Sequence, residues 1–245
     1  MHRLPTDTGT LENGEVAPDK ATGGHLKVLR PKDGEEFELF DGRGAVRRYR
    51  WNAKQKRLSA DGDIVRHPKA ATEITLFACI TKGQRWDWTI QKATELGVAR
   101  IVPVISERTI VRIGESECSA KAERWRTIAE EAARQSDAVW TPAIDEPTGF
   151  RAALAAAAAT QCFVGAITNP PAPPLMRVIS DAAPSAGRCS VFIGPEGDFT
   201  PDELAQLLEF AKPASFGRCI LRAETAAIYA LSVLTAAIHA ASKGQ

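Results

Sequence analysis

The stretch FIGPEGDFTPDEL, residues 192–204, decides how the second half of this chain is expected to fold. Its apolar start ends in Gly-Pro-Glu-Gly at residues 194–197, and a helix-start pattern follows at once. Thr200 stands in the N-cap position, Pro201 in the first helical position and Glu203 three residues after the cap, which makes a capping box. The stretch therefore predicts a strand, a glycine-bounded turn and a helix in rapid succession.

The turn contains one carboxylate that the helix does not need. Loss of an N-cap typically lowers stability by about 1 kcal/mol, so stability explains Thr200 and Glu203. Glu196 lies outside the capping box, and the glycines that bound the turn let a ligand approach the backbone without meeting a Cβ atom. Two interpretations of Glu196 stay open: a carboxylate that accepts hydrogen bonds from turn amides, or a group that takes part in chemistry.

Outward from this turn, apolar runs alternate with helical patterns from residue 74 onward. Such alternation predicts an α/β domain with a mostly parallel sheet, in which ligands bind at the carboxyl ends of the strands. Strands are predicted at residues 74–80, 99–105, 161–167, 189–194 and 214–217. Helices are predicted at residues 84–96, with Gly97 as a stop, 120–136, 151–159 and from Glu224.

The first seventy residues have a β-rich pattern instead. EEFELFDG, residues 35–42, alternates apolar and polar side chains and ends in an Asp-Gly hairpin signal. HLKVLR at 25–30 and AVRRYRW at 45–51 are predicted to be neighbouring strands, and the polar segment 66–72 reads as a linker. We therefore expect a small β-barrel over residues 1–70 and the α/β domain over residues 73–245.

One basic tract stands out, although the formal net charge is only +1. Residues 42–57 hold seven arginines and lysines and no acid, with Tyr49 and Trp51 among them. Basic side chains with interleaved aromatics indicate a phosphate-binding face. The alternative is a solvated hairpin edge that its charges protect from aggregation.

Cysteines and apolar runs argue against several classes of protein. The five cysteines include no CxxC pair, so we expect neither a disulfide framework nor a metal site. No apolar run reaches the length that spans a bilayer, and the N-terminal residues lack the apolar core of a signal peptide. The expected location is the cytoplasm, with no membrane partner.

A second loop resembles the first in its layout. From Phe216, a predicted strand end meets Gly217, then the apolar residues 219–221, then a long helix. Arg222 directly precedes that helix, where the helix dipole disfavours a cation, which indicates a partner anion or a functional duty. The helix carries an apolar stripe typical of a core helix, but Ile228 and Val233 on its other side leave a dimer seam open.

The two loops together resemble the C-terminal signature of the ribosomal RNA small subunit methyltransferase E (RsmE) family, within the SPOUT superfamily of knotted methyltransferases. Residues 25–42, residues 82–112 and residues 123–136 with Pro142 downstream agree as well, in the family's order. The resemblance spans nearly the whole chain, and its motifs are specific only together.

The resemblance implies transfer of a methyl group from S-adenosylmethionine to N3 of one uridine in 16S rRNA. It further implies an N-terminal PUA-like or OB-like barrel, a SPOUT domain with a trefoil knot, and a homodimer that acts on 16S rRNA or the small ribosomal subunit. The cofactor-binding residues that it implies are Gly165, Ile167, Ile193, Gly194, Glu196, Gly197, Gly217, Cys219, Ile220, Leu221 and Thr225.

The chemistry of uridine assigns further roles. N3 carries a proton and becomes a good nucleophile only once that proton is lost, so a proton acceptor or a stabilising cation is needed. Arg222 is the candidate cation, and Glu196 the candidate for proton acceptance or for positioning the base. The RNA-binding candidates are His25, Lys27, Arg30, Arg43, Arg85, Lys92, Arg108, Arg112, Arg134 and Gln135. For each of these ten, a solvated surface side chain is the competing interpretation.

The sequence departs from the family pattern at two positions, and two alternative functions stay open. Asp198 stands where the family usually has a second glycine after GPEG, and aspartate tolerates unusual backbone angles better than most residues. Ala223 replaces the commoner threonine of LRTET. The alternatives to uridine-N3 methylation are methylation of a ribose 2′-oxygen or of another RNA, and a non-catalytic rRNA-binding assembly factor. A nucleotide-dependent oxidoreductase is disfavoured because no predicted strand is followed by GxGxxG.

Overall fold

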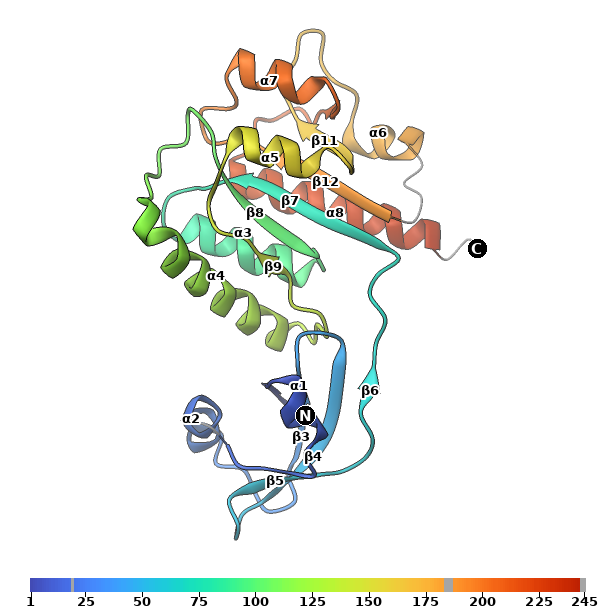
Figure 1. Cartoon of the computed structure of the whole chain (residues 1–245). Coiled ribbons are helices and arrows are strands. Elements are labelled where there is room, and N and C mark those ends of the chain that lie inside the picture. The colour runs from blue at the N-terminus through green and yellow to red at the C-terminus, as the bar shows by residue number, and fades with distance from the viewer. Residues whose placement is uncertain (19, 183–186, 243–245) are drawn as a thin grey trace. The chain divides into compact units, whose positions relative to one another are not determined.

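The computed structural model describes residues 1–18, 20–182 and 187–242, without the side chains of residues 20, 21, 25 and 242 (Figure 1). The chain divides into two compact units. The N-terminal unit combines Met1–Lys69 with Glu130–Thr141, and the second unit holds Ala70–Ala129 and the rest of the chain.

The second unit is built on a parallel sheet with strand order β10-β8-β7-β12-β11-β13, and β9 pairs with β8. The described strands are β7 Thr72–Cys79, β8 Arg100–Ile105, β9 Ala143–Ile144, β10 Thr148–Gly149, β11 Gln161–Gly165, β12 Gly187–Ile193 and β13 Lys212–Ala214. This confirms the predicted α/β class and its mostly parallel sheet.

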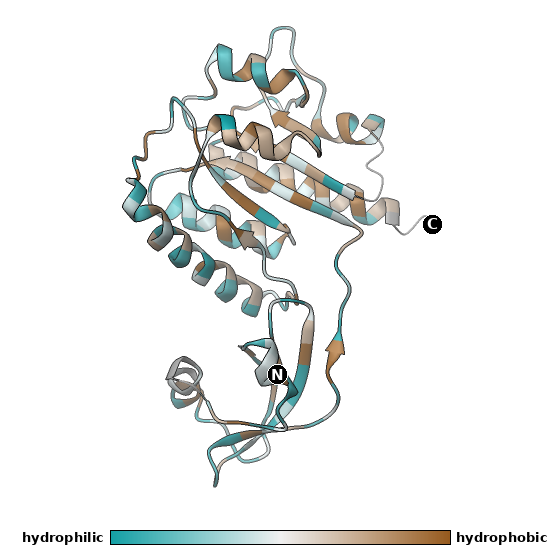
Figure 2. Cartoon of the chain, viewed as in Figure 1, coloured by the Kyte–Doolittle hydropathy of each residue, from teal (hydrophilic) through white to brown (hydrophobic). Residues whose placement is uncertain are grey.

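Helices cover both faces of this sheet (Figure 1). The helices are α3 Gln84–Glu95, α4 Glu115–Gln135, α5 Phe150–Ala157, α6 Leu175–Ala182, α7 Pro201–Leu208 and α8 Ala223–Ser242. Successive residues of β7 face opposite sides: Leu76 packs in the core with α3 and α8, whereas Phe77 packs with α5 and α7. Accordingly, Figure 2 shows hydrophobic stretches along β7 and β8 and a largely hydrophilic α4.

Local signals in the second unit are confirmed. Thr200 Oγ1 accepts a hydrogen bond from the Glu203 amide at 3.2 Å, and Glu203 Oε2 accepts one from the Thr200 amide at 3.0 Å. Gly97 has φ +76° directly after α3, as a C-terminal stop requires. The strand predicted at 214–217 is wrong beyond Ala214, because β13 ends there and Gly217 turns the chain with φ +122°.

The N-terminal unit contains a sheet with the order β1-β3-β4-β5-β2, and β6 pairs with β4. Its elements are β1 His2–Pro5, α1 Thr8–Glu12, β2 Glu15–Val16, α2 Lys20–Leu29, β3 Glu36–Phe40, β4 Ala45–Asn52, β5 Arg57–Ala60 and β6 Val65–Arg66. The predicted hairpin is present as β3–β4, and Phe37, Leu39, Tyr49 and Leu58 form its core.

The strand predicted at residues 25–30 is wrong, because this segment is helical through Leu29. A strand would place Leu26 and Val28 on one face, whereas Leu26 is buried and Val28 is 83% exposed. Short apolar runs do not distinguish a strand from a helix by periodicity alone. Arg30 then leaves the helix with φ +49°.

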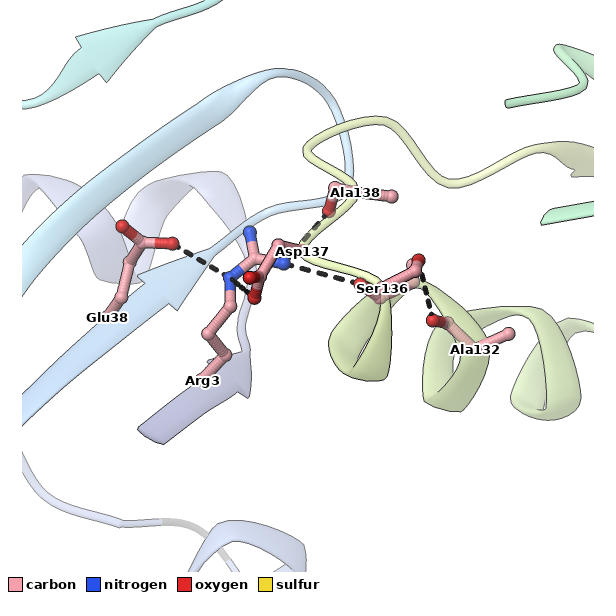
Figure 3. Close-up of polar contacts among 7 residues, drawn as sticks. Arg3, Glu38, Ala132, Ser136, Asp137 and Ala138 are labelled. Atoms are coloured by element: carbon pink, nitrogen blue, oxygen red, sulfur yellow. Dashed lines mark hydrogen bonds and ion pairs between the residues drawn. The ribbon is translucent and has the colours of Figure 1, made fainter. Parts of the chain in front are cut away.

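Arg3 holds the segment Glu130–Thr141 in the N-terminal unit (Figure 3). The Arg3 side chain donates from Nε to Glu38 at 2.8 Å and from Nη1 to the carbonyl oxygens of Ala138 at 3.2 Å and Ala133 at 3.3 Å. Its guanidinium also lies 4.3 Å from the centre of the Phe40 ring, and the residue is only 7% exposed. This contact joins residues about 130 positions apart, which no local pattern indicates.

Helix α8 is long and apolar enough, by length and composition, to cross a membrane. The core helix of a soluble protein passes the same test, and Ala227, Leu231 and Leu234 of α8 are buried against the sheet. Ile238 lies against the same core, whereas Ala241 at the end of the predicted stripe is exposed.

Candidate active site

A pocket of about 610 Å³ lies in the second unit, at the carboxyl ends of three neighbouring strands. Its lining begins at Gly165, the last residue of β11, at Ile193, the last residue of β12, and at Ala214, the last residue of β13. Pockets of this size hold small organic ligands, and the carboxyl ends of parallel strands are where such sheets bind them.

The structure brings ten of the eleven predicted cofactor-binding residues to this pocket. They are Gly165, Ile167, Ile193, Gly194, Glu196, Gly197, Gly217, Cys219, Ile220 and Leu221. Thr225 is the exception, since it is exposed on the first turn of α8 and does not line the pocket. Both candidate catalytic residues, Arg222 and Glu196, line it as well.

Several lining residues were missed by the sequence reasoning. Thr168, Pro171 and Ala172 extend the first loop, and Phe216 and Arg218 belong to the third. Arg218 stands between two predicted residues, so its position in the GRCILR segment was the available signal. The residues after Ile167 carry no sequence motif that could have predicted their place in the pocket lining.

Close backbone packing explains why glycine stands at two of these positions. A Cβ atom on Gly165 would lie 2.4 Å from Cε2 of Phe216, so the first and third loops can touch only without it. A Cβ atom on Gly194 would lie 3.3 Å from the Phe199 ring and 3.1 Å from Asp198 Oδ1. The first and third loops therefore pack against each other, and the middle loop packs against its own Asp198 and Phe199.

Asp198 completes the turn in the way expected of an aspartate. It has φ +58°, in the left-handed region where glycine is most easily accommodated. Its amide donates to the Pro195 carbonyl at 2.9 Å, and its Oδ1 accepts from the Phe199 amide at 2.8 Å. The aspartate side chain thus stabilises a conformation that a glycine would adopt freely.

Two arginines from outside the turn contact it. Arg108 Nη1 donates to the Gly197 carbonyl at 2.9 Å and to the Phe199 carbonyl at 3.5 Å. Arg85 Nη1 lies 3.5 Å from Glu196 Oε1. These contacts connect the turn to α3 and to the segment after β8.

Arg222 is positioned differently from these two arginines. Its carbonyl accepts the Ala226 amide at 2.8 Å, which places it at the start of α8. Its side chain is exposed at the pocket and makes no hydrogen bond or ion pair with the residues that the structure describes. Ile220 and Ile167 are 84% and 67% exposed beside it. A free cation and exposed apolar side chains in one pocket are suited to a ligand with anionic and apolar parts.

The RNA-binding candidates are divided between the two units. Lys27, Arg30, Arg43, Arg134 and Gln135 belong to the N-terminal unit, and the His25 side chain lies outside the described residues. Arg85, Lys92, Arg108 and Arg112 belong to the second unit. Lys92 pairs with Glu95 at 2.8 Å and Arg134 with Glu131 at 2.6 Å, so both are engaged on their own helices.

The basic tract is partly neutralised within its own unit. Arg50 pairs with Glu36 and with Asp61, both at 2.8 Å, and Arg47 donates to the carbonyls of Leu11 and Gly62. Both arginines therefore make contacts within their own unit. The interpretation of a hairpin edge does not hold for them, because β4 is a central strand paired with β3 and β5.

The cysteines are isolated from one another as thiols. Burial raises the pKa of Cys79 and Cys162 to about 12 and that of Cys189 to about 11, which keeps them protonated. Cys219 is exposed at the pocket. Within residues 1–18, 20–182 and 187–242, no group of three or more His, Cys, Asp or Glu side chains is arranged to hold a metal ion.

Comparison with known proteins agrees with this site. A family model described as an RNA methyltransferase domain matches residues 68–235. The α/β unit with the strand-end pocket thus belongs to a class of RNA-modifying enzymes. The chain is a member of the RNA methyltransferase domain family.

The relatives define the group more closely. The ribosomal RNA small subunit methyltransferase E of Synechocystis is 28% identical over 87% of this chain and 70% of its own length. The protein of that name from Bacillus subtilis is 31% identical over 66% of this chain and 65% of its own length. The crystal structure of the Neisseria gonorrhoeae protein of that name, bound to S-adenosyl methionine, superposes with a TM-score of 0.80 at 29% identity, covering 96% of both chains. Within its family, this chain is therefore similar to the RsmE proteins.

Proposed function

We propose that this protein transfers a methyl group from S-adenosylmethionine to N3 of a specific uridine in 16S rRNA. The observation that carries the proposal is the pocket in which three glycine-containing loops meet beside Arg222, whose side chain has no partner among the described residues. The names of the relatives and the ligand of the Neisseria structure support the same donor and the same class of RNA.

The donor is proposed to bind between the three loops. Gly217 has open space where a Cβ atom would lie, so the adenine or the ribose can come close to the backbone there, whereas Gly165 and Gly194 give room to neighbouring side chains of the pocket loops. Ile220 and Leu221 provide an apolar wall for the ring. Thr225 stays a predicted contact, although it lies outside the pocket lining. When bound, S-adenosylmethionine supplies an electrophilic methyl group on a positively charged sulfur.

Arg222 is proposed to stabilise the uridine anion. The N3 proton must leave as the new N–C bond forms, and the negative charge then spreads over the two neighbouring carbonyl oxygens of the base. An exposed guanidinium with no other partner can donate to such an oxygen. Glu196 is proposed to accept the proton or to position the base, and its contact with Arg85 keeps its carboxylate at the pocket.

The finer features of the fold and assembly belong to the same proposal. We propose that the pocket loops form a trefoil knot, that the N-terminal sheet is a PUA-like or OB-like barrel, and that two chains form a homodimer in the cytoplasm. Half-buried Ile228 on α8 supports a contact between copies along that helix, whereas Val233 packs against the core of its own unit. The partner is proposed to be 16S rRNA or the small ribosomal subunit, contacted through basic side chains of both units.

Mass spectrometry of rRNA nucleosides from a deletion strain tests the proposal. Loss of 3-methyluridine from 16S rRNA, restored by the wild-type gene, is the expected result, and undiminished 3-methyluridine would refute it. Loss of a 2′-O-methylated nucleoside instead would identify the ribose-directed alternative. Calorimetry with S-adenosylmethionine separates the enzyme from a non-catalytic assembly factor, because only the enzyme is expected to bind the donor.

A further inference from the structure

The segment after β8 contacts the Gly194–Gly197 turn and the helix that follows it at the same time. The Glu107 amide donates to Glu203 Oε1 at 2.9 Å, and Glu203 is the buried acid of the capping box. The next side chain, Arg108, donates to the Gly197 carbonyl at 2.9 Å. Two successive residues therefore hold both ends of the link between the turn and α7.

A second arginine contacts the turn from α3. Arg85 Nη1 lies 3.5 Å from Glu196 Oε1, and its Nε lies 3.8 Å from Glu224 Oε1. Glu224 is only 7% exposed, and its other carboxylate oxygen is buried without a hydrogen bond. A buried carboxylate needs a compensating cation, so Glu224 attracts Arg85 toward the start of α8. The guanidinium thereby joins the middle pocket loop to the third.

We propose that Arg108 and Arg85 are positioning residues for the methyl-donor pocket, rather than contacts for RNA phosphates. Arg108 fixes the backbone of the middle loop, and Arg85 fixes the direction of the Glu196 side chain relative to α8. The proposal rests on the assignment of this pocket to S-adenosylmethionine.

The geometry indicates that Arg108 contributes more than Arg85 to the binding of the methyl donor. Its bond to Gly197 is short and charge-assisted, and the carbonyl that it holds belongs to a turn that lines the pocket. Without it, the Gly197 carbonyl loses its charge-assisted bond, so the backbone of the turn between β12 and the capping box is held less firmly. Arg85 makes longer contacts, at 3.5 Å and 3.8 Å, so its removal is expected to raise the Kd for the donor less than removal of Arg108.

Isothermal titration calorimetry with S-adenosylmethionine, in the absence of RNA, tests this on the full-length protein. Arg108→Ala is expected to raise the Kd for the donor about tenfold, the size of one charge-assisted hydrogen bond. Arg85→Ala is expected to raise it by a smaller factor. Arg151→Ala is the matched control, since Arg151 is exposed on α5 and has no partner among the described residues.

Turnover measurements separate positioning from RNA binding. Arg108→Ala is expected to raise the KM for S-adenosylmethionine while the KM for the RNA stays near wild type. Arg108→Lys keeps a cation that can donate to a carbonyl, so its donor Kd is expected to fall between those of wild type and Arg108→Ala.

Three results would overturn the inference: a donor Kd of Arg108→Ala equal to wild type, a rise shared by Arg151→Ala, or an Arg108→Lys variant that binds no better than Arg108→Ala. An RNA-binding role would instead appear as weaker RNA binding with a reduced salt dependence. Failure of the wild-type protein itself to bind S-adenosylmethionine would refute the proposed function, so the two failures are distinguishable.

Discussion

The Gly194–Gly197 turn and the N-terminal sheet differ in how far along the chain their stabilising partners lie. The turn has partners three residues apart, as in the bond from Asp198 to Pro195 and the capping box of Thr200 and Glu203, in addition to the distant Arg108. The N-terminal unit depends on Arg3, whose carbonyl partners lie some 130 residues away. Short-range partners leave a signal in the local sequence, and long-range partners do not.

The largest expected effect lies in the pocket. Arg222→Ala is predicted to lower the rate of methyl transfer about 10²–10³-fold, because one donor to the developing anion is lost. The Kd for S-adenosylmethionine is expected to stay close to wild type, since the donor contacts come from the loops. Single-turnover assays with labelled S-adenosylmethionine measure the first quantity and calorimetry the second.

Arg151→Ala serves again as the exposed control for Arg222→Ala, and it is expected to turn over like wild type. Near-normal turnover of Arg222→Ala would remove this residue from the mechanism. Arg222 would then be a residue that the local sequence singles out but that methyl transfer does not need.

The next prediction tests the long-range contact. Arg3→Ala is expected to lower the free energy of unfolding of the N-terminal unit by about 2–3 kcal/mol, because Glu38 and the carbonyls of Ala133 and Ala138 lose their donor. Amide hydrogen exchange should rise throughout residues 130–141. Urea denaturation and exchange mass spectrometry measure the two effects.

Arg48→Ala is the control for Arg3→Ala, since Arg48 is exposed on the same sheet and has no partner among the described residues. Unchanged exchange of residues 130–141 in Arg3→Ala would mean that packing, not the guanidinium, holds this segment in place.

The sequence predicted the second unit well because its signals are local and of different kinds. Buried apolar runs gave the strands, and Gly97 and the capping box gave helix boundaries. The pocket followed from the glycine-containing loops and the family resemblance, which is why ten predicted residues line it. Thr225 does not line the pocket although Ala223 and Ala226 on the same first turn of α8 do, because the Thr225 side chain is exposed on another side of the helix.

The N-terminal unit was less predictable for physical reasons. LKVL satisfies the pattern of a strand and that of a helix equally, and only the packing of Leu26 against the N-terminal core selects the helix. Residues 130–141 belong to the N-terminal unit because the buried Arg3 bonds to them. Nothing in the sequence indicates that Arg3 pairs with this segment. The RNA-binding function predicted for Arg85 and Arg108 stays a prediction. The sequence could not indicate the contacts of these arginines with the turn, because their carboxylate and carbonyl partners are distant in the chain.

Helix α2 offers a sharper test of this ambiguity. Leu26→Ala is expected to lower the free energy of unfolding by about 2–3 kcal/mol, because a buried side chain leaves a cavity. Val28→Ala should change it by less than about 0.5 kcal/mol, because Val28 is exposed. Urea denaturation of both variants measures the difference. A strand would bury both side chains on one face, so equal losses would contradict the helix.

The smallest effect concerns the cap of α7. Thr200→Ala is expected to lower stability by about 1 kcal/mol, measured by urea denaturation, with Thr200→Ser close to wild type because serine keeps the capping oxygen. The Kd of Thr200→Ala for S-adenosylmethionine should rise less than that of Arg108→Ala, because Arg108 still holds the Gly197 carbonyl when the cap is lost. If Thr200→Ala weakens donor binding as much as Arg108→Ala does, the local cap fixes the turn and the distant arginine adds little. The conformation of the turn would then depend on residues near in the sequence alone, whereas the N-terminal unit depends on a contact between residues far apart in the chain.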